Sequence, residues 1–450
     1  MPTIDIVGGG ILGLALGYDL IKRGIGVRIW ERSHELGGLM GRTRFDELDG
    51  LEVDRYYHAI LSSDRTLMRL FEELGLRSEL RMTTTSMGFY HNGKLYPMST
   101  PLDFLRFPPL SPIDRFRLGL AILRARQVKD WRALEQIPVV EWLTNLSGRR
   151  TVEHIWKPLL RAKFDGGFDN VPATYIWSRL VRTTDTREKG GAVEKMCFLP
   201  GGYAMLIDAL AKAIIARGGR ITTSVAVQQV RINNGQVCGL RLSDGEIASD
   251  GAVLTLQTPI ARRLLPPEAA DVNARWSALE DYLGIVCMLL VLRRSLSPYY
   301  TLNITDERIP FTGVIETTNL IDRQFTNGYH LVYLPKYVAP DNLFTQMNDE
   351  ALQRSFLVYL RQMFPDLQTE DIAALRIGRE RYVEPLHPIG RTDDIPPFTT
   401  GIAGLYLVNS SQIYPQLTNG EAAVAHAAQA AKIIEQTIPV NEDLQQAITI

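Results

Sequence analysis

Hydrophobic and polar positions follow two different periods at the start of the chain. Thr3–Val7 is a short apolar run typical of a buried strand. Ile11–Arg23 repeats apolar residues at helical spacing and ends before Gly24, where a glycine commonly closes a helix. Val27–Trp30 is a second apolar run, followed by Glu31. This strand–helix–strand order predicts a βαβ unit and a parallel sheet.

The rest of the chain predicts a mixture of helices and strands. Two β-rich runs flank Asn92-Gly93, which predicts a hairpin over Met87–Tyr96. Ser111-Pro112 predicts a helix start, because serine caps the first turn and proline fits inside it. The pattern further predicts helices at Ala204–Arg217, Asp349–Phe364 and Glu421–Gln436, and strands at Arg220–Thr223, Val225–Ile232, Val237–Leu242, Ala252–Leu256 and Leu405–Asn409. We therefore expect an α/β plus α+β protein.

Length and composition narrow the class of protein. A chain of 450 residues is about three times the usual length of one domain, so two or more domains are expected. The chain is 45% hydrophobic and 22% charged, which is typical of a globular protein. A formal net charge of −1 gives no electrostatic basis for binding nucleic acid.

Cysteine use and apolar runs bear on location. Cys197, Cys238 and Cys287 form no CxxC pair, so they suit a reducing compartment and supply neither a disulfide framework nor a metal site. The N-terminus opens directly into a strand without a basic leader. The longest apolar runs, such as Gly284–Leu292, are shorter than the roughly 20 residues that span a bilayer. We expect a cytoplasmic protein, in solution or at the membrane face.

The motif that carries chemistry is Gly8–Gly13, which satisfies G-x-G-x-x-G between the first strand and the helix. Gly8 allows a tight turn, Gly10 allows backbone to approach a pyrophosphate, and Gly13 lets the helix lie against the sheet. The amides of Ile11 and Leu12 then open a helix whose positive end attracts phosphate. The carboxylate of Glu31 can accept both hydroxyls of an adenosine ribose and would repel a 2′-phosphate. The alternative is a glycine-rich turn of some other α/β protein.

A second glycine pair, Gly37-Gly38, follows Glu31-Arg32 closely. With it the chain resembles the FAD-dependent amine oxidase superfamily, and within it the protoporphyrinogen oxidase and phytoene desaturase branch. Amine oxidases usually continue the glycine pair with arginine, whereas this chain has Leu39, with Arg42 and Thr43 following. The resemblance implies FAD as cofactor.

Three later segments extend the resemblance. Leu199–Leu210 is similar to the family's P-x-G-G stretch, and Val227 begins a segment similar to the strand that contacts adenine. The family's Gly-Asp after the last strand is replaced by Asn409-Ser410-Ser411, before Asn419-Gly420 opens the final helix. The FAD-binding residues that the resemblance implies are Gly8, Gly10, Ile11, Leu12, Gly13, Glu31, Arg32, Gly37, Gly38, Leu39, Arg42, Thr43, Val227, Asn409, Ser410, Asn419, Gly420 and Glu421.

The resemblance also implies a domain plan. A Rossmann-type FAD-binding domain is assembled from residues 1–80, 198–260 and 390–437. A substrate domain with a mixed sheet takes residues 81–197 and 261–389, including a helical, membrane-facing subdomain at about 100–190.

Catalytic side chains are harder to identify, because the flavin supplies most of the chemistry. His58 falls where the family chain passes the flavin, and it is either a base or an ordering hydrogen-bond partner. Lys163 is either a base with a lowered pKa in an apolar cavity or half of a structural ion pair. Tyr414 and His387 are candidates for lining the pocket from the C-terminal side.

Residues 101–129 are a candidate membrane-contact segment. Ile113, Phe116, Leu120 and Leu123 form an apolar stripe at helical spacing. Six cations are concentrated around it: Arg106, Arg115, Arg117, Arg124, Arg126 and Lys129. Such a segment either lies on an anionic membrane and admits a lipid-soluble substrate, or packs its stripe into the protein.

Three functions are compatible with these patterns. The leading one is an FAD-dependent oxidoreductase that desaturates or dehydrogenates a small lipophilic substrate by hydride transfer to flavin. The second is a non-redox flavin-dependent isomerase or mutase acting on a sugar nucleotide or lipid-linked substrate. The third is a non-catalytic binding protein on the same scaffold. The pattern favours no particular oligomeric state.

Overall fold

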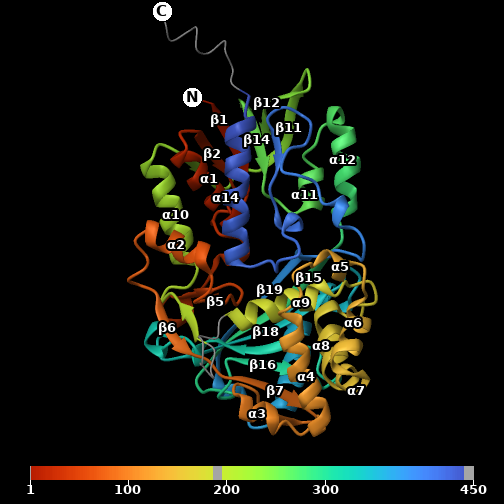
Figure 1. Cartoon of the computed structure of the whole chain (residues 1–450). Helices are drawn as coiled ribbons and strands as arrows, with labels where there is room; N and C mark the ends of the chain where they lie inside the picture. The colour runs from red at the N-terminus through yellow and green to blue at the C-terminus, as the bar shows by residue number, and fades with distance from the viewer. Residues whose placement is uncertain (1, 186–194, 440–450) are drawn as a thin grey trace, which may run out of the picture.

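The computed structural model describes residues 2–185 and 195–439. In Figure 1 the first and last parts of the chain lie together in the upper half of the molecule, and most of the middle forms the lower half. Segments that are far apart in the sequence therefore build one structural unit.

The upper half is organised by a five-stranded parallel sheet with the order β10-β2-β1-β14-β20. Its strands are β1 (Thr3–Val7), β2 (Gly26–Trp30), β10 (Arg220–Thr222), β14 (Gly251–Leu254) and β20 (Leu405–Leu407). Strand β1 is central, so the glycine-rich turn that follows it lies at the middle of the carboxyl edge of the sheet. Ligands of open parallel sheets bind at this edge.

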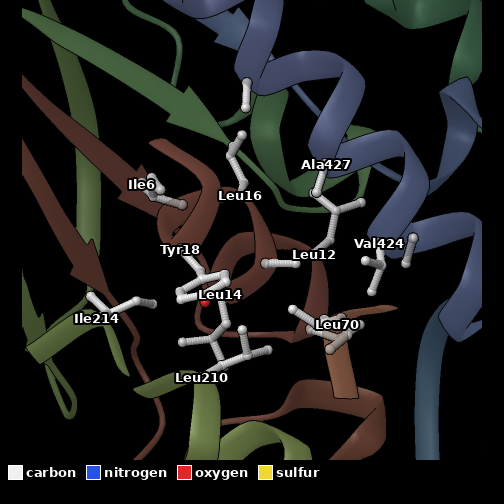
Figure 2. Close-up of a cluster of buried hydrophobic side chains, with 14 of the residues drawn as sticks. Ile6, Leu12, Leu14, Leu16, Tyr18, Leu70, Leu210, Ile214, Val424 and Ala427 are labelled. Carbon is white, nitrogen blue, oxygen red and sulfur yellow. The ribbon is translucent and has the colours of Figure 1, made fainter. Parts of the chain in front are cut away.

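One face of the parallel sheet is covered by helices. They are α1 (Ile11–Lys22), α10 (Ala204–Ala216) and α14 (Gly420–Thr437), with α2 (Arg65–Glu73) packed beside α14. Figure 2 shows Leu12 and Leu16 of α1 directed towards Val424 and Ala427 of α14, while Leu14 meets Leu210 of α10. Burial of each leucine or valine side chain stabilises the fold by about 1.5–3 kcal/mol. The glycine-rich turn is thereby fixed on a rigid core.

The other face of the parallel sheet packs against a small antiparallel sheet of β11 (Val227–Asn233), β12 (Gln236–Leu242) and β13 (Gly245–Ala248). Helices α11 (Thr258–Arg262) and α12 (Ala270–Trp276) complete this layer. The upper half thus has helices on one face of its parallel sheet and a second sheet with helices on the other.

The lower half is built around a seven-stranded sheet with the order β19-β15-β18-β17-β16-β7-β8. Every residue of β15 is buried, and successive side chains enter two different hydrophobic cores. The pairings are antiparallel except for β16 with β7. The strands are β7 (Met87–His91), β8 (Lys94–Pro97), β15 (Tyr282–Leu292), β16 (Thr301–Ile304), β17 (Gly313–Glu316), β18 (His330–Val338) and β19 (Ile372–Pro385).

Helices and short sheets surround the large sheet. Helix α13 (Asp349–Met363) covers one face. A helical layer flanks the sheet and consists of α3 (Pro101–Leu105), α4 (Pro112–Ala125), α5 (Arg132–Glu135), α6 (Val139–Ser147), α7 (Arg149–Thr151), a π-helical turn (Val152–Trp156), α8 (Lys157–Phe164) and α9 (Thr174–Asp185). The short strands pair as β3-β4 and β5-β9-β6: β3 (Arg42–Phe45), β4 (Leu51–Asp54), β5 (Ile60–Leu61), β6 (Arg81–Thr84) and β9 (Lys195–Phe198).

The local elements predicted from the sequence are confirmed. Asn92 and Gly93 have φ angles of +48° and +77° between β7 and β8, as the hairpin requires. The Ser111 hydroxyl accepts a hydrogen bond from the Asp114 amide and caps α4. Within the described residues, no helix is long and apolar enough to cross a membrane. The three cysteines are free, with Cys197 and Cys287 buried.

Candidate functional site

The turn after β1 shows why three of its residues are glycines. Gly8 has a φ of +118°, and a Cβ there would lie 2.6 Å from the Thr255 hydroxyl oxygen. A Cβ on Gly13 would overlap the carbonyl oxygen of Gly8, so glycine lets α1 start against the strand. By contrast, the nearest atom to a Cβ on Gly10 would be the Gly37 carbonyl oxygen at 3.9 Å. Gly10 therefore leaves open space beside the helix start.

The second glycine pair lies against this open space. The Gly37 amide donates to the Gly9 carbonyl at 2.9 Å, and Gly10 and Gly37 form an isolated β-bridge. Gly37 and Gly38 both have positive φ angles, +106° and +57°. A Cβ on Gly38 would lie 3.6 Å from the Cα of Gly10. Backbone alone thus lines this open space, which we call the glycine groove and which side chains at these positions would fill.

Helix α1 presents its free amides to the groove. Gly10 is its N-cap and has no side chain, and no acidic residue occupies the first turn. The amides of Ile11 and Leu12 and the positive end of the helix are therefore available to an anion. A diphosphate matches this uncapped helix start.

Glu31 stands at the other end of the groove. Its carboxylate accepts hydrogen bonds from the amides of Gly9 and Ser33, each at 2.8 Å. Each carboxylate oxygen retains a lone pair for a further donor, such as a ribose hydroxyl. The Val225 amide donates to the Glu31 carbonyl at 3.1 Å, which brings the chain leading to Val227 beside this end. The residues present fit the adenosine diphosphate half of FAD.

After the glycine pair, the structure gives Arg42 and Arg55 different roles from those expected from the sequence. The Arg42 guanidinium is bound to Asp208 at 2.6 Å and to Glu52 at 3.0 Å, so its side chain serves a surface ion-pair network. Arg55 was not predicted from the sequence as a site residue. Its guanidinium lies 3.6 Å from Glu35 and next to Gly41. The Arg55 guanidinium, unlike that of Arg42, therefore lies beside the glycine segment 37–41. Arg32 is exposed, Leu39 packs against a buried core, and Thr43 lies in β3.

The start of α14 meets the same region from the C-terminal side. The Asn419 side chain caps the helix by accepting from the Ala422 amide at 3.0 Å. A Cβ on Gly420 would lie 2.7 Å from the Tyr203 hydroxyl oxygen, and that buried hydroxyl has no hydrogen-bond partner among the described residues. The Glu421 carboxylate accepts from the amides of Thr66 and Leu67 at 3.0 and 2.7 Å, so it caps α2. Glu421 thereby ties α14 to α2, and its carboxylate is committed to this contact.

The segment after β20 is held by its own side chains. Asn409 donates to the Leu256 carbonyl at 2.8 Å and accepts from the Ser411 hydroxyl at 2.7 Å. Its amide group is therefore committed to joining β20 to the segment before α11. Ser410 opens the short turn that follows.

His58 lies beside Tyr203, where the two halves meet. Its Nδ1 is 2.9 Å from the Tyr56 carbonyl oxygen, and its ring packs edge-on against Tyr203 with centroids 5.4 Å apart. Burial lowers the pKa of His58 to about 4. The imidazole is therefore neutral at pH 7 and can accept a proton or a hydrogen bond.

His58→Ala should leave the flavin bound and slow its reduction by substrate, because the ring contacts Tyr203 and is not among the atoms nearest to the glycines of the groove. Neutral His58 is lost as the pH falls through about 4, so the reduction rate should be flat from pH 6 to 8 and decline on the acid side. Stopped-flow absorbance of the flavin measures both effects. An unchanged rate in the variant would remove His58 from the catalytic candidates.

Asp54 supports the same corner. Its carboxylate accepts from the Tyr203 amide at 2.8 Å, and burial raises its pKa to about 7. A Cβ on Gly202 would overlap this carboxylate, which explains a glycine with a φ of +67° there. The Tyr333 hydroxyl donates to the Asp54 carbonyl at 2.6 Å. Asp54 thus links the P-x-G-G stretch to the large sheet.

Lys163 belongs to a buried cluster of polar side chains rather than to His58's immediate surroundings. Its ammonium lies 3.1 Å from the Glu384 carboxylate and 3.3 Å from the centre of the Tyr337 ring. The side chains of Tyr337 and Tyr57 interact, and each shifts the pKa of the other. Tyr57 is the neighbour of His58 in the chain, so the cluster reaches from α8 to the corner at His58.

A pocket of about 190 Å³ opens between α8, α9, residues 384–388 and the loop 413–418; we call it the inner pocket. Tyr414 lines it, with its hydroxyl 2.6 Å from the Thr174 hydroxyl and its ring 4.8 Å from that of His387. His387 Nε2 is 2.7 Å from the Ser411 carbonyl oxygen. The loop leads directly into α14, so this pocket adjoins the start of that helix.

The inner pocket also contains Glu384 and Tyr175, which were missed in the sequence. The Tyr175 hydroxyl is buried and has no hydrogen-bond partner among the described residues. Burial raises the pKa of Tyr175 to about 12, so the group remains a hydroxyl donor. No local motif marks either residue, because the pocket joins positions more than 200 residues apart.

Comparisons with known proteins agree with this geometry. The sequence model of a family described as flavin containing amine oxidoreductase matches residues 13–434. A zeta-carotene desaturase of Arabidopsis thaliana is 23% identical over 59% of this chain, and the match spans only 52% of that relative's length. A carotenoid phi-ring synthase of Streptomyces griseus is 25% identical over 88% of this chain and 80% of its own. A proposed protoporphyrinogen oxidase from Exiguobacterium sp. 255-15 shares the fold, with a TM-score of 0.74, 20% identity and coverage of 97% and 99% of the two chains.

Proposed function

Since this chain belongs to the flavin-containing amine oxidoreductase family, we propose that it uses FAD to desaturate or dehydrogenate a small lipophilic molecule bound in the inner pocket. FAD is the cofactor of the family, and the expectation of an FAD-dependent oxidoreductase is confirmed. The two relatives described above are named for reactions on carotenoids, which favours oxidation of a lipophilic substrate over the isomerase alternative.

One observation carries the proposal: His58, the start of α14 and the inner pocket lie close together, because Tyr203 contacts both His58 and Gly420 and the loop 413–418 lines the pocket. The groove runs from Glu31 past Gly10 and Gly37. The loop 413–418 lines the inner pocket and continues into the start of α14. A cofactor whose diphosphate lies at α1 would therefore extend towards the place where a substrate can enter.

The chain's own residues would bind and orient the reactants. When bound, FAD supplies a ring that accepts a hydride. The free amides of α1 and the Glu31 carboxylate would hold its adenosine diphosphate half. The uncharged His58 could take a proton from the substrate, while Tyr175 could donate a hydrogen bond within the pocket. The helix end at Gly420 is placed to stabilise negative charge opposite Tyr203.

The test is a visible spectrum followed by anaerobic titration. Purified protein should carry a flavin, and a lipophilic substrate of this class should bleach it stoichiometrically without added reductant. Polyenes, porphyrinogens and amines provide the first panel. Turnover that occurs only after dithionite reduction, without net oxidation, would indicate the isomerase instead. A protein that binds no flavin would overturn the proposal.

The domain plan is proposed on the same grounds. We assign residues 1–80, 198–260 and 390–437 to an FAD-binding unit, because they contribute the parallel sheet, the covering helices and the glycine groove. The remaining segments, 81–197 and 261–389, contribute the large sheet and the helical layer and would form the substrate unit.

The same proposal includes membrane contact through α3 and α4. On α4, Ile113, Phe116 and Leu123 are 65%, 71% and 58% exposed. The buried face of the helix is formed instead by Asp114, Leu118, Ala121 and Ala125. Packing of the stripe into the protein is therefore excluded for these three residues. Exposed Leu102 and Leu105 of α3 and the neighbouring arginines extend a surface suited to an anionic bilayer.

Replacing both Phe116 and Leu123 with glutamate should weaken binding to anionic vesicles by at least about tenfold, because apolar area and charge attraction are both reduced. The melting temperature should stay the same as that of the wild type, since neither side chain is buried. Co-sedimentation with phosphatidylserine vesicles measures the effect. Leu343→Glu is the matched control, because Leu343 is also 71% exposed but lies outside this segment. Equal sedimentation of all variants would contradict the membrane proposal.

A further inference from the structure

The inner pocket adjoins a second, more open one. This outer pocket has a volume of about 690 Å³ and lies between α11, residues 280–283 and the end of β19. The two pockets share Phe164, Gly167, Asp281 and Leu386 as lining residues. They are therefore adjacent, and we call the two together the cleft, with an inner end near α14 and an outer end at the surface.

Three arginines line the outer pocket, and two of them form no ion pair with the described residues. Arg262 is paired with Glu280 and donates to the Asn273 side chain at 2.6 Å. Arg263 and Arg381 are exposed, and neither forms an ion pair within the described part of the chain. The Arg381 guanidinium lies 5.3 Å from the centre of the Tyr382 ring. Two guanidinium groups thus remain available to a ligand.

The lining of the inner pocket differs in charge from that of the outer pocket. Its described lining includes the carboxylates of Asp281 and Glu384 but no lysine or arginine. Lys163, which does not line the pocket, neutralises the charge of Glu384. Asp281 stands at the junction of the two pockets. An anion is consequently disfavoured at the neck, beside Asp281, and favoured at the outer end, beside the two arginines.

We infer that the substrate carries an anionic head group, with phosphate or carboxylate oxygens, which Arg263 and Arg381 bind in the outer pocket. The uncharged part of the molecule passes Phe164 and Leu386 into the inner pocket, where the Tyr175 hydroxyl meets it. Guanidinium groups suit this role, because their planar donors match such oxygens and stay charged. The inference deepens the proposed function and rests on it. The substrate is thus an amphiphile rather than a pure hydrocarbon.

The experiment uses the purified holoenzyme and isothermal titration calorimetry with three probes: octyl phosphate, octanoate and octanol. At least one anionic probe should bind about tenfold more tightly than octanol at low salt, and the difference should shrink as salt is added. Whichever anion binds better identifies the head group as phosphate or carboxylate. The double variant Arg263→Gln, Arg381→Gln should lose this preference while octanol binding stays unchanged.

Two further variants make the result specific. Arg354→Gln is the matched control, because Arg354 is an exposed arginine on α13 that does not line the cleft. Asp281→Asn should tighten binding of the anionic probe by removing repulsion at the neck. Equal binding of the three probes, or a preference that survives in the double variant, would overturn the inference. Calorimetry reports binding whether or not the flavin is reduced, so bleaching by another substrate can fail or succeed independently.

Discussion

Gly10→Val is expected to give a folded protein that retains no flavin. A valine side chain would project into the space beside the uncapped start of α1, where a diphosphate must approach backbone. Nothing in the protein occupies that space within 3.9 Å of the new Cβ, so the fold should tolerate the change. The flavin content, measured by the absorbance ratio of the purified protein, should fall by at least about tenfold. The circular dichroism spectrum should match that of wild type stripped of flavin.

Gly13→Val provides the contrast within the same turn. Its side chain would collide with the Gly8 carbonyl, so this variant should fail to fold rather than fold without flavin. Normal flavin content in Gly10→Val would show that the cofactor lies elsewhere. Misfolding of both variants would show that Gly10 is needed for packing. That result would contradict the open space beside Gly10.

Lys163→Met should destabilise the protein by about 3–5 kcal/mol, because it removes the ammonium paired with the largely buried Glu384 carboxylate. The two side chains are only 7% and 16% exposed, so solvent cannot compensate well. The loss of the ammonium over the Tyr337 ring adds to the effect. Urea unfolding of the holoenzyme, followed by tryptophan fluorescence, measures the change in the free energy of unfolding.

A second substitution separates charge burial from catalysis. The double variant Lys163→Met, Glu384→Leu removes both charges and should recover most of the stability. If it still reduces its flavin normally, Lys163 is a structural residue; if reduction is lost at restored stability, Lys163 or Glu384 acts on the substrate. Lys157→Met is the control, because its exposed pair with Glu153 should contribute less than about 1 kcal/mol. A loss of similar size in the control would refute the argument from burial.

Elements with local signals could be predicted from the sequence. The first βαβ unit is marked by period, glycines and a terminal acid within about thirty residues, and the structure reproduces it. The cap at Ser111 and the turn at Asn92-Gly93 are equally local. These structures depend on residues that are close together in the chain, so a single sequence is enough to predict them.

The polar side chains of the cleft could not be predicted in this way. Glu384 reaches Lys163 across 221 positions, and no spacing rule connects a residue at the end of β19 with one on α8. The orientation of α4 was also undecided, because the helix has two faces that could be buried. The small residues Ala121 and Ala125 pack inward, and the larger apolar side chains remain outside. Pairings and burial of this kind are set by the whole fold.

The parallel sheet has a consequence for synthesis on the ribosome. Its central strand, β1, is made first, but β14 and β20 join the sheet only after residues 251 and 405 have appeared. Helix α14, which covers α1, comes later still. The nascent chain must therefore hold an unfinished, apolar βαβ segment through most of translation, where chaperones can bind it. Loading of flavin should accordingly be a late, largely post-translational event.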